Sequence, residues 1–126
     1  MNSSSAFAIH ADTECNVMYF NFVGHVKVAE MTAGLVELKR VVATLRPGFM
    51  IFSDLSDLES MDLDCAGPLT KTMDLCRTKG VGTVVRVIPN PIKDIGFNIL
   101  SVIHYREGVK IRTFHSRAEA DAALKL

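Results

Sequence analysis

One cysteine of this sequence is placed where a thiol could do covalent chemistry. Cys65 opens the stretch CAGPLTK at 65–71, and a thiol at the start of a helix can have a lowered pKa and act as a nucleophile. Backbone amides at such a position could also hold an oxyanion. The basic residue of the stretch is Lys71, whereas an arginine could hold an anion through two hydrogen bonds. Pro68 has no backbone N–H, so one possible donor to an oxyanion is missing. The competing interpretation is a small, half-buried thiol without a catalytic role.

An acidic run directly precedes this cysteine. Its members are Asp54, Asp57, Glu59, Asp62 and Asp64, with no basic residue among them. Carboxylate oxygens are the ligands that calcium and magnesium prefer, so a metal site is one interpretation. The run lacks the turn glycine and the closing glutamate of a calcium loop. We therefore favour a solvated loop that caps the next helix, and we predict no metal and no other cofactor.

The cysteines and histidines show no pattern of a disulfide framework or a metal centre. The cysteines are odd in number and no two of them form a C-x-x-C pair; they are Cys15, Cys65 and Cys76. The histidines fall in four different predicted elements: His10, His25, His104 and His115. This usage is typical of a reducing environment, so a cytoplasmic location is expected.

Length and composition indicate one globular domain over residues 1–126. The chain is 48% hydrophobic, which is enough for a core of its own. Fourteen basic residues balance fourteen acidic ones, so nothing in the charge favours a nucleic-acid partner. The first residues do not resemble a secretory signal, and no apolar stretch is long enough to span a membrane.

Apolar periodicity predicts the elements that position the acidic run and Cys65. From Val28 to Leu45 apolar residues recur at steps of three and four, as on one face of a helix, and Leu69, Met73 and Cys76 do the same. A continuous apolar run at 49–52 and a nearly continuous one at 81–88 are typical of buried strands. Asn90 and Pro91 favour a helix start.

The remaining elements lie at the two ends of the sequence. The predicted strands are 6–10 and 16–23, joined as a hairpin, and 109–114, near a sheet edge. A capping box at 116–119 opens a last helix that ends at Leu124. The predicted order is β-β-α-β-α-β-α-β-α: an α/β domain with a mostly parallel five-stranded sheet, an N-terminal hairpin and four helices.

This order and the segment GFMIFSDLSDLESMDLDCAGPL at 48–69 resemble the STAS domain (sulfate transporter and anti-sigma factor antagonist) of the SpoIIAA-like type. In that family an apolar strand leads through a DLS-like end to an Asp-Ser-Ser-Gly motif that opens a helix. Asp64, Cys65, Ala66 and Gly67 match the motif. The connection is slightly longer than in the family, so Asp62 is an alternative to Asp64 for the motif aspartate.

The resemblance implies a binding module without its usual switch. In the antagonist branch the second motif serine accepts phosphate from a partner kinase, and the added charge breaks the complex. Ala66 occupies that position and has no oxygen to phosphorylate. We therefore expect a non-enzymatic, regulatory, protein-binding domain that lacks the phosphoacceptor. The expected contact residues are Asp62, Asp64, Cys65, Ala66, Gly67, Leu69, Thr70 and Met73.

Two other kinds of partner are open at this point. Methionines and phenylalanines could line a pocket for a small apolar or lipid-like ligand, although core filling explains most of them. They are Met18, Met31, Met50, Met61, Met73, Phe7, Phe20, Phe22, Phe49, Phe52 and Phe97. The edge strand and the neutral net charge also allow a homodimer. A thiol enzyme built on Cys65 is the third hypothesis.

Overall fold

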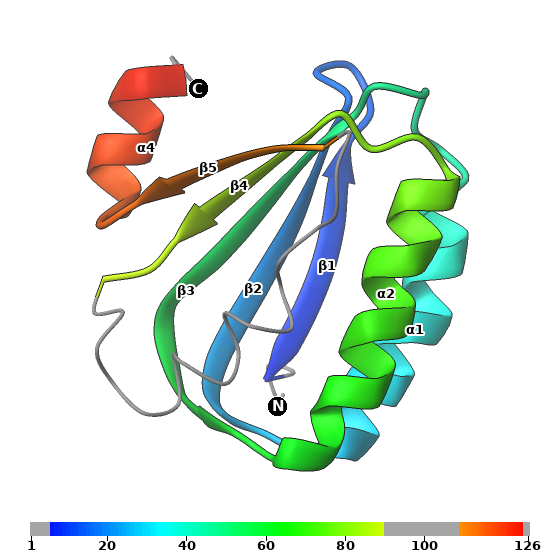
Figure 1. The fold of residues 1–126 in the computed structure, drawn as a ribbon, viewed down its shortest axis with the longest axis vertical. Coiled ribbons are helices and arrows are strands. Elements are labelled where there is room, and N and C mark those ends of the chain that lie inside the picture. Colours follow the sequence, from blue (N-terminus) through cyan, green and yellow to red (C-terminus); the bar gives the residue numbers. More distant parts are fainter. Residues whose placement is uncertain (1–5, 90–108, 125–126) are drawn as a thin grey trace.

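The computed structural model describes residues 6–89 and 109–124 (Figure 1). The strands are β1 (Phe7–Asp12), β2 (Val17–Val26), β3 (Met50–Met61), β4 (Thr83–Val87) and β5 (Lys110–Phe114). The helices are α1 (Val28–Val42), the short 3-10 helix η1 (Leu63–Cys65), α2 (Ala66–Thr78) and α4 (Arg117–Leu124). The helix predicted to start at residues 90–91 lies outside the described residues, so three of the four predicted helices are observed in the described part of the chain.

The five strands form one sheet in the order β1-β2-β3-β4-β5. β1 pairs antiparallel with β2, whereas the β2–β3, β3–β4 and β4–β5 pairings are parallel. The sheet is therefore mixed, which replaces the predicted mostly parallel description, because the N-terminal hairpin is part of the same sheet. β5 is an edge strand, as its alternation of apolar and charged residues indicated.

Helices cover both faces of the sheet (Figure 1). α1 packs against β1 and against α2 on one face, and α4 packs against β4 and β5 on the other. The larger core cluster lies under α1 and α2, and the smaller one joins Phe52, Val85 and Val87 to Ala120 of α4. Within the described residues, none of the helices is long and apolar enough to cross a membrane.

Most of the methionines and phenylalanines listed as possible pocket residues fill this core. The fully buried ones belong to the two clusters: Phe7, Phe20, Phe22, Phe49, Phe52, Met18 and Met31. Met50, Met61 and Met73 are half-buried and pack against the clusters. Phe97 lies outside the described residues. Close packing of a core accounts for these side chains.

Helix α1 is shorter than its apolar stripe suggested, and one glycine sets its distance from the sheet. The stripe predicts a helix to Leu45, but α1 ends at Val42 and a turn follows, in which the Thr44 amide donates to the Val41 carbonyl. Gly34 is buried on the inner face of α1, and a methyl group in its place would overlap the ring of Phe7. The absence of a side chain at Gly34 thus lets α1 lie directly on β1.

Two other predicted helix boundaries, the end of α2 and the start of α4, are confirmed. Gly80 has a φ of 94°, a left-handed conformation that glycine adopts easily, and the Val81 amide donates to the Cys76 carbonyl. At the start of α4 the Glu119 amide donates to the Ser116 hydroxyl at 3.0 Å, which is one half of the predicted capping box.

The acidic run is strand as far as Met61 and then 3-10 helix, not the solvated loop that we predicted. β3 continues through Met61 because β2 extends to Val26 and supplies backbone partners, with the last pair Val26↔Met61. Leu55 of this stretch is buried, while Ser56 and Asp57 are exposed. β4 pairs with β3 only as far as Asp54↔Val87. Beyond that point, in the described residues, β2 and β3 form a two-stranded ribbon that leads to α2.

Candidate binding surface at the start of helix α2

The ends of β2 and β3 hold the start of α2 in place. After Met61 the Asp62 amide donates to the Val26 carbonyl at 3.0 Å, which continues the strand pairing by one step. The Cys65 amide then donates to the Asp62 carbonyl at 2.9 Å and closes the turn of η1. α2 follows directly, with Ala66 as its first residue. The Asp-Cys-Ala-Gly segment therefore lies at a helix start, as the resemblance implied.

The predicted contact residues divide into an exposed set and a buried set. Asp64, Ala66, Gly67 and Thr70 are exposed, and Asp62 and Met73 are partly exposed. Cys65 and Leu69 are buried in the main core cluster, with 0% and 4% of their surfaces exposed. These two side chains anchor α2 to the core and do not contribute to the outer surface.

Leu63, which we had not predicted as a contact residue, is the most exposed large apolar side chain of the described residues. It lies in η1 with 76% of its surface exposed, directly before Asp64. We define the α2 start surface as five exposed residues of η1 and the first turn of α2 and its continuation, namely Leu63, Asp64, Ala66, Gly67 and Thr70. A leucine between two aspartates was the only sequence signal for it.

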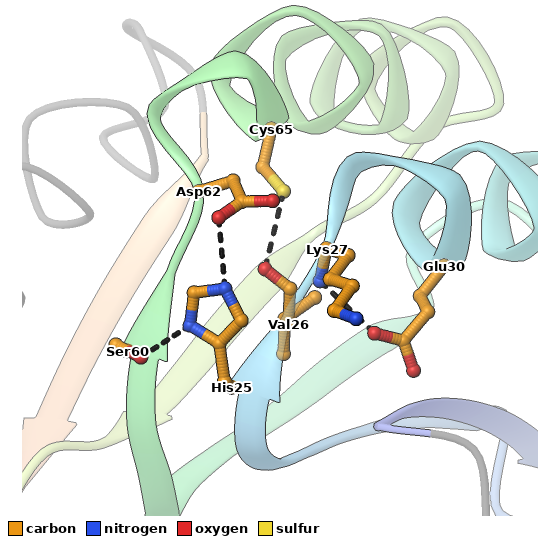
Figure 2. A network of polar contacts seen from close by, with 7 residues as sticks. All are labelled: His25, Val26, Lys27, Glu30, Ser60, Asp62 and Cys65. Carbon is orange, nitrogen blue, oxygen red and sulfur yellow. Dashed lines mark hydrogen bonds and ion pairs between the residues drawn. The ribbon is translucent and has the colours of Figure 1, made fainter.

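A histidine links the two strands beside this surface, and sequence reasoning missed it (Figure 2). His25 Nε2 lies 2.8 Å from Asp62 Oδ1, and Nδ1 contacts the Ser60 hydroxyl. A neutral ring can donate from Nε2 to the carboxylate and accept at Nδ1 from the hydroxyl. The parallel register His25↔Ser60 brings the residues together. Spacing along the chain gave no indication of this contact.

Serine, histidine and aspartate are also the residue types of a hydrolytic triad. In such a triad the aspartate is buried beside the imidazole. Here the side chains of His25 and Asp62 are 44% and 43% exposed, so solvent screens the pair. We interpret the cluster as a polar link between the ends of β2 and β3.

The Cys65 thiol is held in a position that disfavours the thiolate. Its Sγ donates to the Val26 carbonyl at 3.6 Å, as Figure 2 shows. Burial raises the pKa of Cys65, and the nearby Asp62 carboxylate raises this pKa further. A nucleophilic cysteine needs the opposite shift and access to its substrate. The geometry therefore favours the interpretation of Cys65 as a core thiol.

Alkylation of native protein with iodoacetamide tests this assignment. We expect Cys15, which is exposed, to be labelled first, and Cys65 and Cys76 to be labelled only after unfolding in urea. The hydrogen bond to Asp12 raises the pKa of Cys15, so its labelling rate should rise at a higher pH than that of free cysteine. Peptide mass spectrometry measures each site, with Cys15→Ser as the control. Rapid labelling of Cys65 in folded protein at mildly acidic pH would revive the thiol-enzyme hypothesis.

The acidic run does not converge on one point. Asp54 forms an ion pair with Arg117 of α4 at 3.4 Å, on the face away from α1 and α2. Asp57 and Glu59 are exposed, and Asp62 is engaged by His25. Across residues 6–89 and 109–124, no three His, Cys, Asp or Glu side chains form a group that could hold a metal ion. Alternation along β3 explains why neighbours in sequence point in different directions.

Comparison with known proteins identifies the fold. No family model matches the chain, and no curated protein does. Among solved structures, an uncharacterized DUF3478-family protein with a SpoIIAA-like fold from Shewanella loihica PV-4 matches at a TM-score of 0.66 and 16% identity, over 98% of both chains. This chain has a SpoIIAA-like fold. The unphosphorylated anti-sigma factor antagonist SpoIIAA matches at a TM-score of 0.57 and 16% identity, over 95% of this chain and 98% of that one.

A third solved structure is also similar to this chain. The protein TM1081 has a TM-score of 0.60 and 19% identity, over 98% of this chain and 91% of that one. The fold expected from the STAS resemblance is thus confirmed over nearly the whole chain. At these identities the SpoIIAA-like fold is what the matches establish.

Proposed function

We propose that this SpoIIAA-like domain is a non-enzymatic regulatory module that binds another protein through the α2 start surface. The observation that carries the proposal is Leu63, a large apolar side chain that is 76% exposed beside the exposed Asp64 and Ala66. Burial of an exposed leucine in a partner's apolar pocket would contribute roughly 1.5–3 kcal/mol, so Leu63 is available as an aliphatic anchor. The likeness to an anti-sigma factor antagonist supports the same class of function.

The chemistry of the α2 start surface indicates what kind of partner would fit. A side chain added at Gly67 would meet no heavy atom within 4 Å, so a partner's backbone can approach closely there. Asp62 and Asp64 place two carboxylates at the rim, where arginine or lysine of a partner would be complementary. We therefore propose a partner that offers an apolar pocket with a basic rim.

The proposed complex has no phosphoswitch at the position used in the antagonist branch. Ala66 is the first residue of α2 and carries only a methyl group. The nearest exposed hydroxyl along α2, that of Thr70, donates to the Ala66 carbonyl at 2.8 Å. We accordingly propose a binding module whose contact surface is not regulated by phosphorylation at position 66.

Substitutions on this surface test the proposal. Leu63→Asp and Gly67→Arg should each weaken the Kd for the partner by about 10- to 100-fold, because loss of an apolar anchor or a steric block at the centre of an interface typically has this effect. The partner is identified by affinity capture with the wild-type chain and mass spectrometry, and the Kd is then measured with purified proteins by calorimetry.

Val36→Asp is the matched control, because Val36 is an exposed valine on α1, remote in sequence from the α2 start surface. It makes the same kind of apolar-to-acid change and should leave the Kd unaltered. Circular dichroism verifies that every variant is folded. Binding that persists in both Leu63→Asp and Gly67→Arg, or that is lost equally in Val36→Asp, would contradict the assignment of the surface.

The two alternative partners of the sequence analysis give different results. A homodimer formed through the edge strand β5 would show a dimer mass by light scattering that Leu63→Asp does not change. A carrier of an apolar ligand would show a bound mass in native mass spectrometry of freshly purified protein. The proposed module should show neither.

A further inference from the structure

A buried arginine lies in the sheet, far along the chain from the α2 start surface. Arg86 is the penultimate residue of β4 and has 7% of its surface exposed. Its neighbours on the same face of β4 are Val84 and Ile88, both members of the main core cluster. Arginine is rarely buried to this degree unless its charge is paired.

The hydrogen bonds of Arg86 leave part of the guanidinium unsatisfied. Nε and Nη2 donate to the Thr113 hydroxyl oxygen at 3.3 and 2.9 Å, whereas the buried Nη1 has no hydrogen-bond partner within residues 6–89 and 109–124. Among the described residues no carboxylate forms an ion pair with Arg86. Burial lowers the pKa of Arg86, as expected for a cation taken out of water without an anion beside it.

Two residues with hydroxyl side chains flank Arg86 in the sheet. The parallel registers Ser53↔Arg86 and Arg86↔Thr113 place a serine of β3 and a threonine of β5 on either side, on the same face of the sheet. Ser53 is buried as well. The Thr113 oxygen accepts from Arg86, so its own O–H can donate to a third group. A free guanidinium N–H and the Thr113 hydroxyl thus lie side by side, and Ser53 is the neighbour of Arg86 on β3.

We propose that Arg86, Ser53 and Thr113 form a binding site for a small oxyanion, a carboxylate or a phosphate group. Charge-assisted hydrogen bonds from arginine are the usual way in which proteins hold such groups. The site lies near the carboxyl ends of the parallel strands β4 and β5, and ligands of open α/β sheets bind at the carboxyl ends of strands. The proposed anion site is separate from the α2 start surface, and the two proposals do not depend on each other.

Thermal unfolding with added anions tests the site. Inorganic phosphate or acetate should raise the Tm of the wild-type chain more than chloride at the same ionic strength, because a ligand that binds only the folded state stabilises it. A response to phosphate alone would indicate a phosphate-type ligand, a response to acetate alone would indicate a carboxylate-type ligand, and a response to both would indicate a site that accepts either group. No rise beyond that with chloride would overturn the proposal.

Two variants make the test specific. Thr113→Val should weaken the apparent Kd for the responding anion by about 10-fold, since it removes one hydroxyl and keeps the side-chain shape. Arg86→Met should abolish the response. In anion-free buffer Arg86→Met should unfold at a Tm no lower than that of the wild-type chain, because methionine replaces an uncompensated charge with an apolar group.

A large fall in the Tm of Arg86→Met in that buffer would show that another group of the chain already compensates the guanidinium, and the proposal would fail. An equal anion response in Arg86→Met and the wild-type chain would show a non-specific salt effect and would also overturn it. Because these readouts do not involve a protein partner, they fail or succeed separately from the proposed function.

Discussion

Leu69→Ala is expected to lower the free energy of unfolding by about 2–5 kcal/mol, as truncations of buried leucines do. Leu69 belongs to the main core cluster, on the inner side of α2 together with Cys65 and Cys76. The truncation removes buried apolar surface and leaves a cavity under the α2 start surface. Urea denaturation followed by circular dichroism measures the change.

Thr70→Ala is the control for this experiment, because Thr70 is the next residue of α2 and is exposed. Exposed positions of this kind usually change stability by less than about 0.5 kcal/mol. Comparison of the two variants separates the effect of losing a buried contact of α2 from the effect of a change on its exposed side. If Leu69→Ala weakened partner binding while the free energy of unfolding stayed unchanged, Leu69 would be a contact residue and its assignment to the core would be wrong.

Gly34→Ala is the second substitution with a large expected effect, a loss of about 1–3 kcal/mol from overpacking. The added methyl group would overlap the ring of Phe7. That ring cannot move aside easily, because it stacks on Phe22 at 4.8 Å between centroids and meets Phe20 edge-on at 5.6 Å. The Tm measured by differential scanning calorimetry should fall accordingly.

Gly67→Ala makes the same change where the space is open. Gly67 lies in the first turn of α2, no φ restriction applies to it, and an added Cβ meets no heavy atom within 4 Å. Alanine is favoured over glycine in a helix by up to about 1 kcal/mol, so the Tm should rise or stay level. Equal Tm values for Gly34→Ala and the wild-type chain would mean that Phe7 repacks without loss of stability. The distance between α1 and β1 would then not depend on the absence of a side chain at position 34.

Local patterns were sufficient for most of the fold. The apolar steps of α1 and α2, the hairpin and the capping box at Ser116 all depend on residues close in sequence, and these elements are observed. The extension of β3 through Met61 was missed for a physical reason. Its acidic composition is typical of a loop, and only the pairing with the end of β2 makes it a strand.

The candidate site was predictable in its location and less so in its members. Cys65, Leu69 and Cys76 follow helical spacing, so the sequence contained the signal that Cys65 and Leu69 face the core. The contact of His25 with Ser60 and Asp62 could not be foreseen, because it depends on the register of two strands distant in sequence. The same holds for Arg86, whose burial and hydroxyl neighbours arise from pairing on both sides.

The methyl group of Ala66 has a consequence for how such a module would be controlled in a cell. Under the proposed function, phosphorylation at this position cannot release the partner, so occupancy follows the abundance of the two chains relative to their Kd. Under the proposed function, synthesis and degradation of the domain would then set the response. The response would then change on the timescale of protein turnover and not on that of phosphorylation by a kinase.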